Sequence, residues 1–95
     1  MSAAEVVDTI RRNVDICHLL TVDYQRRLRS HGENWTTKCV KTHRPSGMVV
    51  NQKQQLFFCP TCGASGDVIG LVMSLDGCTF IDAMKKLMMR ALRHR

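Results

Sequence analysis

The sequence predicts a small α+β domain in which a short antiparallel sheet is flanked by N-terminal and C-terminal helices. Apolar residues recur at helical spacing near both ends of the chain, whereas short runs of strand-forming residues separated by turn residues occupy the middle. A length of 95 residues suits one compact domain. We therefore expect a single domain over residues 1–95, with a helical part at 3–20, a sheet at 24–66 and helices at 67–93.

The first predicted element is a helix over residues 3–20 with a break near residues 13–15. Its apolar residues recur close to a helical period, and we expect this apolar side to lie on the sheet. These residues are Val6, Val7, Ile10, Val14 and Cys17.

The middle of the chain predicts an antiparallel meander of short strands. The strands are expected at residues 34–39, 47–50 and 55–58. The turns are expected at residues 30–32, 45–47 and 51–53, where Gly, Pro, Ser and Asn gather.

Two helices are predicted after the sheet. Ser65 or Asp67 can cap a helix that runs to about residue 75, and Thr79 can cap a last helix after a turn at residues 76–77. The last helix carries an apolar stripe that we expect to face inward. The stripe consists of Phe80, Met84, Leu87, Met88 and Ala91.

Cys39, His43, Cys59 and Cys62 form the pattern C-x3-H-x15-C-x2-C, which is typical of a structural zinc site in a zinc ribbon. Two short ligand pairs on either side of a hairpin can enclose one Zn²⁺ tetrahedrally. The second pair is the stronger signal, and His31 or Thr42 are alternatives to His43 as the fourth ligand. Gly63 and Gly66 would let the backbone wrap around the metal and turn amide donors toward the sulfurs.

The same cysteine pair could instead belong to a redox Cys-x-x-Cys motif, but the first ligand pair and the absence of a βαβ setting disfavour that interpretation. Cys17 and Cys78 stand among apolar residues and are expected to be small buried side chains. A closed four-ligand zinc site lacks the open position that catalysis requires. Because no paired carboxylates, nucleophile elbow or phosphate-binding glycine loop accompany it, we expect no catalytic residues and no enzyme activity from these residues by themselves.

The formal net charge of +6 is concentrated in the predicted sheet region, where Glu33 is the sole acidic residue. Such a field favours a polyanionic partner, most often nucleic acid, although a solvated surface that aids solubility is an equally ordinary explanation. The candidate phosphate-binding residues are Arg26, Arg27, Arg29, Lys38, Lys41, Arg44 and Lys53.

Aromatic residues in the strands offer stacking surfaces for bases. Strand alternation places Phe57 and Phe58 on opposite faces of the sheet, so that one can enter the core while the other is exposed. Trp35, on another predicted strand, can likewise either enter the core or be exposed. We take Trp35 and Phe58 as candidate nucleic-acid contacts, with core packing as the alternative for each.

Several segments together resemble the N-terminal zinc-binding domain of bacterial DnaG-type primases over about residues 5–92. These segments are Ile10–Ile16, Gly32–Cys39, Leu56–Asp67 and Gly77–Phe80. The resemblance implies a zinc ribbon that binds single-stranded DNA template and helps a separate catalytic domain to begin a primer, with Cys39, His43, Cys59 and Cys62 as ligands. The chain departs from the family pattern in having three residues between Cys39 and His43, followed by Arg44-Pro-Ser-Gly-Met48.

The predicted function is thus a template-binding module for a separate primase or polymerase, in the cytoplasm of a bacterium or encoded by a phage or mobile element. The alternative is a protein-binding adaptor that docks onto a polymerase, a recombinase or the replicative helicase through the methionine-rich last helix. A transcription regulator is a third hypothesis, which a preference for duplex DNA would favour. No apolar run in the sequence reaches the roughly 20 residues that span a bilayer, and no membrane partner is expected.

Overall fold

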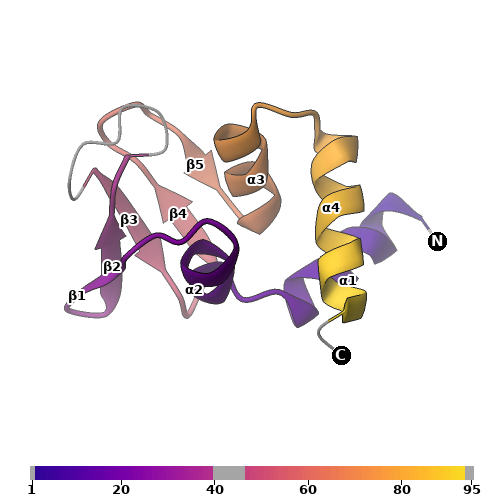
Figure 1. Ribbon diagram of the computed structural model, residues 1–95, viewed down its shortest axis with the longest axis horizontal. Coiled ribbons are helices and arrows are strands. Elements are labelled where there is room, and N and C mark those ends of the chain that lie inside the picture. Colours follow the sequence, from indigo (N-terminus) through magenta and orange to yellow (C-terminus); the bar gives the residue numbers. More distant parts are fainter. Residues whose placement is uncertain (1, 40–46, 94–95) are drawn as a thin grey trace.

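The computed structural model describes residues 2–39 and 47–93. Within these ranges the chain forms a five-stranded antiparallel sheet, four α-helices and one π-helical segment, η1, which confirms the predicted α+β class. The sheet and helix α4 lie at opposite ends of the molecule, with helix α3 between them (Figure 1). No helix in the described ranges has the length and apolar character needed to cross a membrane.

The N-terminal helical segment is interrupted where the sequence predicts. Helix α1 (Ala3–Asn13) begins at Ser2, whose hydroxyl accepts a hydrogen bond from the Glu5 amide at 3.3 Å. After an extended stretch, Asp15 caps helix α2 (Ile16–His18), which continues directly into η1 (Leu19–Asp23). The expectation that the first helix lies on the sheet is wrong for α1, which packs against α4, whereas α2 lies near the sheet (Figure 1).

The strands follow one another in chain order across the sheet, and every neighbouring pair is antiparallel. They are β1 (Arg29–His31), β2 (Asn34–Thr37), β3 (Met48–Asn51), β4 (Leu56–Phe58) and β5 (Ser65–Gly66). The meander prediction is therefore right for β2, β3 and β4. It missed both edge strands, and residues 30–31, predicted as a turn, pair with β2.

One face of the sheet is covered and the other is open, as the period-2 alternation of strands requires. The register places Trp35, Val50 and Phe57 in one row on the covered face. Val50 and Phe57 are buried in the core with residues of α2, η1 and α3. The adjacent row on the open face contains Arg29, Thr36, Val49, Phe58 and Ser65.

The turn between β3 and β4 is fastened to the start of α2. The Asp15 carboxylate accepts hydrogen bonds from the Gln55 side-chain amide at 2.7 Å and from Gln52 at 3.3 Å. The Gln55 side-chain carbonyl also accepts a hydrogen bond from the Ile16 amide at 2.7 Å. This exchange satisfies an N-terminal amide of α2 and holds the hairpin against the helix.

The two C-terminal helices start at candidate caps from the sequence, with Asp67 rather than Ser65 at the first helix. Asp67 caps helix α3 (Val68–Asp76) by accepting the Ile69 and Gly70 amides at 3.0 Å each, and Gly77 ends it in the left-handed region at φ +64°. Thr79 accepts the Asp82 amide at 3.2 Å at the start of helix α4 (Phe80–Arg93).

The predicted inward stripe of α4 is only partly correct. Leu87 and Ala91 are buried, and Met84 and Met88 pack against the core from its margin. The prediction that Phe80 faces inward is wrong: the residue lies in the first turn of the helix and is 43% exposed. Arg90 takes an unexpected place on the inward side, where it is only 3% exposed and bonds Asp23.

Candidate metal centre and open sheet face

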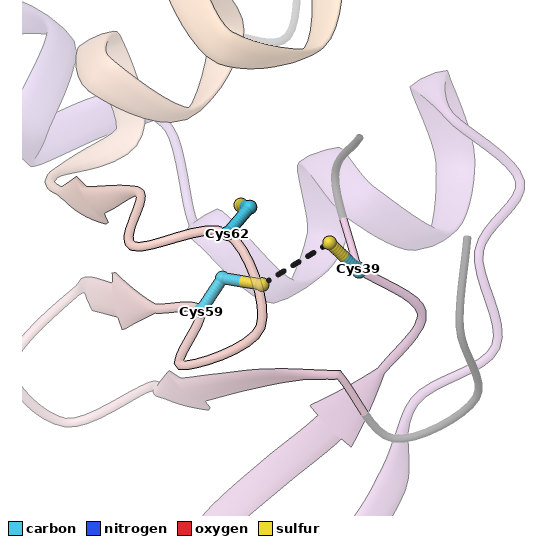
Figure 2. Close-up of side chains that lie close together, drawn as sticks. All are labelled: Cys39, Cys59 and Cys62. Carbon is cyan, nitrogen blue, oxygen red and sulfur yellow. Dashed lines mark hydrogen bonds between the residues drawn. The ribbon is translucent and has the colours of Figure 1, made fainter. Parts of the chain in front are cut away.

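Three cysteine sulfurs meet at one end of the sheet. Cys39 follows β2, and Cys59 and Cys62 lie in the turn that follows β4, so the two sides of the site come from different parts of the meander (Figure 2). The three Sγ atoms all lie within 4.8 Å of one another, and those of Cys39 and Cys59 are 3.3 Å apart. Cys39 and Cys59 are fully buried, and Cys62 is half-buried.

This arrangement fits a zinc ion. Zn–S bonds of about 2.3 Å in tetrahedral geometry separate two thiolate sulfurs by roughly 3.8 Å, which lies within the spread of the three sulfurs. Cys17 and Cys78 do not belong to the described cluster. Cys17 is buried as predicted, and burial followed by the nearby Asp15 charge raises its thiol pKa to about 11, so it stays protonated at neutral pH.

The turn that carries Cys59 and Cys62 is shaped by backbone hydrogen bonds. The Cys59 amide donates to the Ala64 carbonyl at 2.7 Å, and the Gly63 amide donates to the Cys59 carbonyl at 2.7 Å with Gly63 at φ +80°. A left-handed φ is most accessible to glycine, which explains its place directly after Cys62.

Backbone donors also act on the Cys59 sulfur. Burial raises the Cys59 pKa, whereas the amides of Cys62 and Thr61 that face the sulfur lower it in part. The amide donors to the Cys59 sulfur are thus those of Cys62 and Thr61, whereas the amide of Gly63, where the sequence predicts a donor to the sulfurs, bonds the Cys59 carbonyl. As a thiol, Cys59 donates to the Gly47 carbonyl at 3.0 Å. A bound Zn²⁺ takes the place of the thiol proton.

The fourth predicted ligand, His43, lies outside the described residues, as do the predicted phosphate-binding residues Lys41 and Arg44 and the alternative ligand Thr42. The other alternative, His31, is described: it lies in β1 and does not join the cysteine cluster. His43 therefore stays the predicted fourth ligand.

The described phosphate candidates occupy three different places. Arg29 is exposed on the open face of β1, and Lys53 is exposed in the turn between β3 and β4. Arg26, Arg27 and Lys38 surround a pocket between the end of η1 and β2. Arg26 also has a structural contact that the sequence does not reveal, because its Nη1 donates to the Lys38 carbonyl at 3.0 Å and the Cys39 carbonyl at 3.4 Å.

The two aromatic candidates lie on opposite faces. Phe58 is 52% exposed on the open face, and Phe57 is 3% exposed on the covered one. Trp35 shares the covered face with Phe57 and packs against the core while half-buried. Phe58 and Trp35 therefore cannot form one continuous stacking platform.

Comparison with known proteins identifies the type of domain. The chain matches the CHC2 zinc finger family, the zinc ribbon of DnaG-type primases, over residues 2–94. A DNA primase of Listeria monocytogenes is 31% identical over 84 residues, which cover 87% of this chain and 13% of that protein. A DNA primase of Geobacillus stearothermophilus is 31% identical over 88 residues, which cover 92% of this chain and 14% of that protein.

A solved structure of a primase has a similar fold. The crystal structure of the Aquifex aeolicus primase, comprising its zinc-binding and RNA polymerase domains, superposes with a TM-score of 0.77 at 28% identity, covering 96% of this chain and 22% of that one.

The chain belongs to the CHC2 zinc finger family, and it is a primase-type zinc-binding domain with a structural zinc site. It spans about one seventh of the length of the Listeria and Geobacillus primases that it matches. The family match confirms the resemblance that the sequence motifs suggest.

Proposed function

We propose that this chain binds single-stranded DNA template on the open face of its sheet and assists primer initiation by a primase catalytic domain. It supplies no catalytic residues itself; its metal is the structural Zn²⁺ held by Cys39, His43, Cys59 and Cys62. The family match supports this function, and it does not favour the adaptor hypothesis.

The observation that carries the proposal is the exposed Phe58 in the same row as a cationic residue. The row runs from Arg29 through Thr36 and Val49 to Phe58, across four adjacent strands. With strands about 4.8 Å apart, Arg29 lies roughly 14 Å from Phe58, enough for a base on the ring and a phosphate farther along the strand at the guanidinium. Leu56, 42% exposed on the same face, extends the apolar surface beside Phe58.

The electrostatic contribution comes from cations around this face. Arg29 and Lys53 are exposed at two of its margins, and Lys41 and Arg44, which follow Cys39 in the sequence and lie outside the described residues, stay predicted phosphate contacts. Phosphate contacts release counterions, so affinity falls as salt rises, by about 0.7 in the log–log slope for each contact with a single strand.

The proposal is tested by titrating zinc-loaded protein with a fluorescent single-stranded oligonucleotide at two salt concentrations. Replacing Phe58 with Ala should weaken binding about fivefold to a hundredfold, the range for losing one base–aromatic stack. Val22→Ala is the matched control, because Val22 is also 52% exposed but lies on η1. Equal affinities of the Phe58→Ala and wild-type proteins, or affinity independent of salt, would reject the open face as the binding site.

A further inference from the structure

A second cationic feature lies away from the open face. A pocket of about 320 Å³ opens between the segment after η1 and the end of β2. Three cations and no carboxylate line it, in contrast to the mixed charges on the helices. Its lining residues are Tyr24, Gln25, Arg26, Arg27, Thr37 and Lys38.

Thr37 lines this pocket, and its side chain carries an unsatisfied hydroxyl that is itself shielded from solvent. The residue is 4% exposed, and its Oγ1 has no hydrogen-bond partner among the described residues. Burying a hydroxyl without a partner is unfavourable, and valine would fill the same space in a strand without that cost. An anion in the pocket would accept the hydrogen bond that Thr37 can donate once its side chain turns the hydroxyl toward the pocket.

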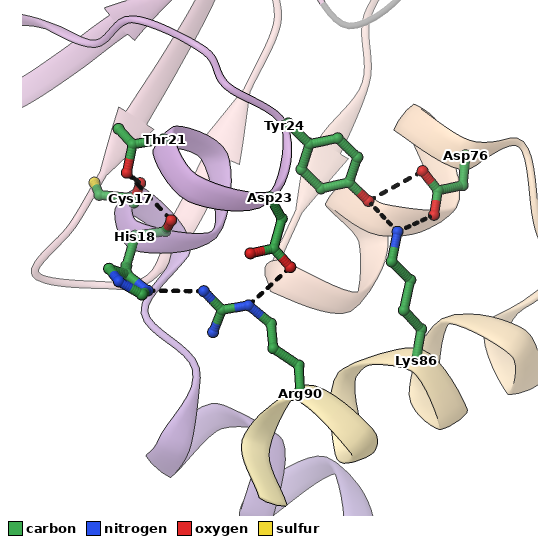
Figure 3. A network of polar contacts seen from close by, with 8 residues as sticks. All are labelled: Cys17, His18, Thr21, Asp23, Tyr24, Asp76, Lys86 and Arg90. Atoms are coloured by element: carbon green, nitrogen blue, oxygen red, sulfur yellow. Dashed lines mark hydrogen bonds and ion pairs between the residues drawn. The ribbon is translucent and has the colours of Figure 1, made fainter. Parts of the chain in front are cut away.

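Nearby carboxylates do not neutralise the pocket, because cations of α4 already engage them (Figure 3). Asp23 accepts a hydrogen bond from Arg90 Nε at 2.9 Å. Asp76 accepts one from Lys86 at 2.7 Å and one from the Tyr24 hydroxyl at 3.0 Å. The positive charges that line the pocket are therefore left for a ligand.

The wall of the pocket is held in place before any ligand binds. Gln25 adopts φ +52°, and Arg26 fixes the backbone of Lys38 and Cys39 through its two carbonyl contacts. Arg27 and Lys38 are exposed, and neither forms an ion pair within the described residues. The pocket thus combines a fixed backbone with two cations that can close on an anion.

We propose that this pocket binds one phosphate group of a nucleic-acid strand or of a nucleotide, through Arg27, Lys38 and the Thr37 hydroxyl. The inference rests on the proposed function, to which it adds a defined phosphate site beside the first zinc ligand. A phosphate is favoured because it is compact, carries several acceptor oxygens and suits a cluster of arginine, lysine and hydroxyl donors.

The test uses zinc-loaded, ¹⁵N-labelled protein and inorganic pyrophosphate at low ionic strength. Pyrophosphate should shift the amide signals of residues 25–27 and 37–38 with saturable behaviour. Thr37→Val should weaken this binding about tenfold, the effect of removing one hydrogen bond to a charged group, while the melting temperature stays equal or rises. Arg27→Ala should weaken it to a similar extent, whereas Lys85→Ala, an exposed lysine of α4, should leave it unchanged.

A competing oligonucleotide without terminal phosphates distinguishes the two sources of phosphate. Displacement of pyrophosphate assigns the pocket to a phosphodiester of the strand, and simultaneous binding assigns it to the phosphates of a nucleotide. Wild-type affinity in Thr37→Val, or no shift at residues 37–38, would overturn the proposal. Phe58→Ala should retain pyrophosphate binding, so failure of the open-face proposal can be recognised separately.

Discussion

Arg90 is the one charged residue that is buried within residues 2–39 and 47–93. Its Nε donates to Asp23 at 2.9 Å, and its Nη2 lies 2.7 Å from His18 Nδ1 (Figure 3). Removing a guanidinium from water is unfavourable, and the carboxylate compensates for that loss only while the pair is intact. The pair links the end of η1 to α4, next to the hydrogen bond that Lys86 of α4 donates to Tyr24.

Replacing Asp23 with Asn should therefore destabilise the fold by about 3 kcal/mol, because it leaves a buried cation without its counterion. Chemical denaturation of the zinc-loaded protein measures the change. Asp8→Asn is the control, since Asp8 pairs with Arg12 on the exposed surface of α1 and should cost less than about 1 kcal/mol. Equal losses of unfolding free energy in the two variants would contradict the larger contribution of the buried Arg90–Asp23 pair.

At the scale of elements, Asp67 connects two helices. One carboxylate oxygen accepts the Ile69 and Gly70 amides at the start of α3, and the other accepts Arg11 of α1 at 2.7 Å. Burial alone would raise the pKa of Asp67, but Arg11 and the two amides outweigh it and lower the pKa below its ordinary value. Folding therefore favours the charged carboxylate.

This shift predicts how stability depends on pH. The contribution of Asp67 is complete above the pKa of the unfolded chain, about 3.9, and is lost as pH falls through the lower folded-state pKa. Asp67→Asn keeps a cap oxygen but loses the charge. The wild-type protein should therefore have the higher free energy of unfolding, and its lead over this variant should shrink as the pH falls below about 3.9. Denaturation of both proteins between pH 3 and 7, with bound zinc measured at each pH, gives this difference at the pH values where both proteins keep their metal. A constant difference would show that the charge does not contribute.

Capping residues and periodicity were sufficient to predict the helices, because Asp67 and Thr79 act locally on amides two or three residues away. The edge strands escaped prediction for a physical reason. Arg29–His31 is exposed at every position and shows no alternation, and β5 has two residues, so only pairing with a neighbour makes them strands. The inward position of Arg90 also depends on a partner distant in sequence.

The cysteine positions of the site could be predicted from spacing alone, since a tetrahedral ion imposes strict distances on its ligands. The surroundings could not. The contact of Arg26 with the Lys38 and Cys39 carbonyls and the unpartnered Thr37 hydroxyl depend on how η1 and β2 approach each other, and no local pattern encodes that approach.

At the scale of the whole molecule, the metal joins the end of β2 to the turn after β4. Structural zinc contributes on the order of 10 kcal/mol in small domains, comparable to the total stability of a domain of this size. The sheet has only short strands and one covered face, so we expect the ion to supply a large share of the free energy that stabilises it.

Purified protein should contain one zinc ion per chain, and a strong chelator should abolish the amide dispersion of the sheet. Elemental analysis and NMR spectra before and after chelation measure both effects, and re-addition of Zn²⁺ should restore the spectrum. Cys59→Ser should behave like the chelated protein, whereas Cys78→Ser, outside the cluster, should keep its metal. An unchanged spectrum after complete removal of the ion would contradict a structural role.

The hairpin of β3 and β4 is anchored at both of its ends. Asp15 binds the closed end at Gln52 and Gln55, and Cys59 contacts the Gly47 carbonyl at the open end. Sliding one strand by a single residue would break both attachments and exchange the two adjacent phenylalanines between solvent and core. Positions 57 and 58 carry the same side chain. The two anchors therefore help to decide which phenylalanine ring lies in the core and which is exposed to a ligand.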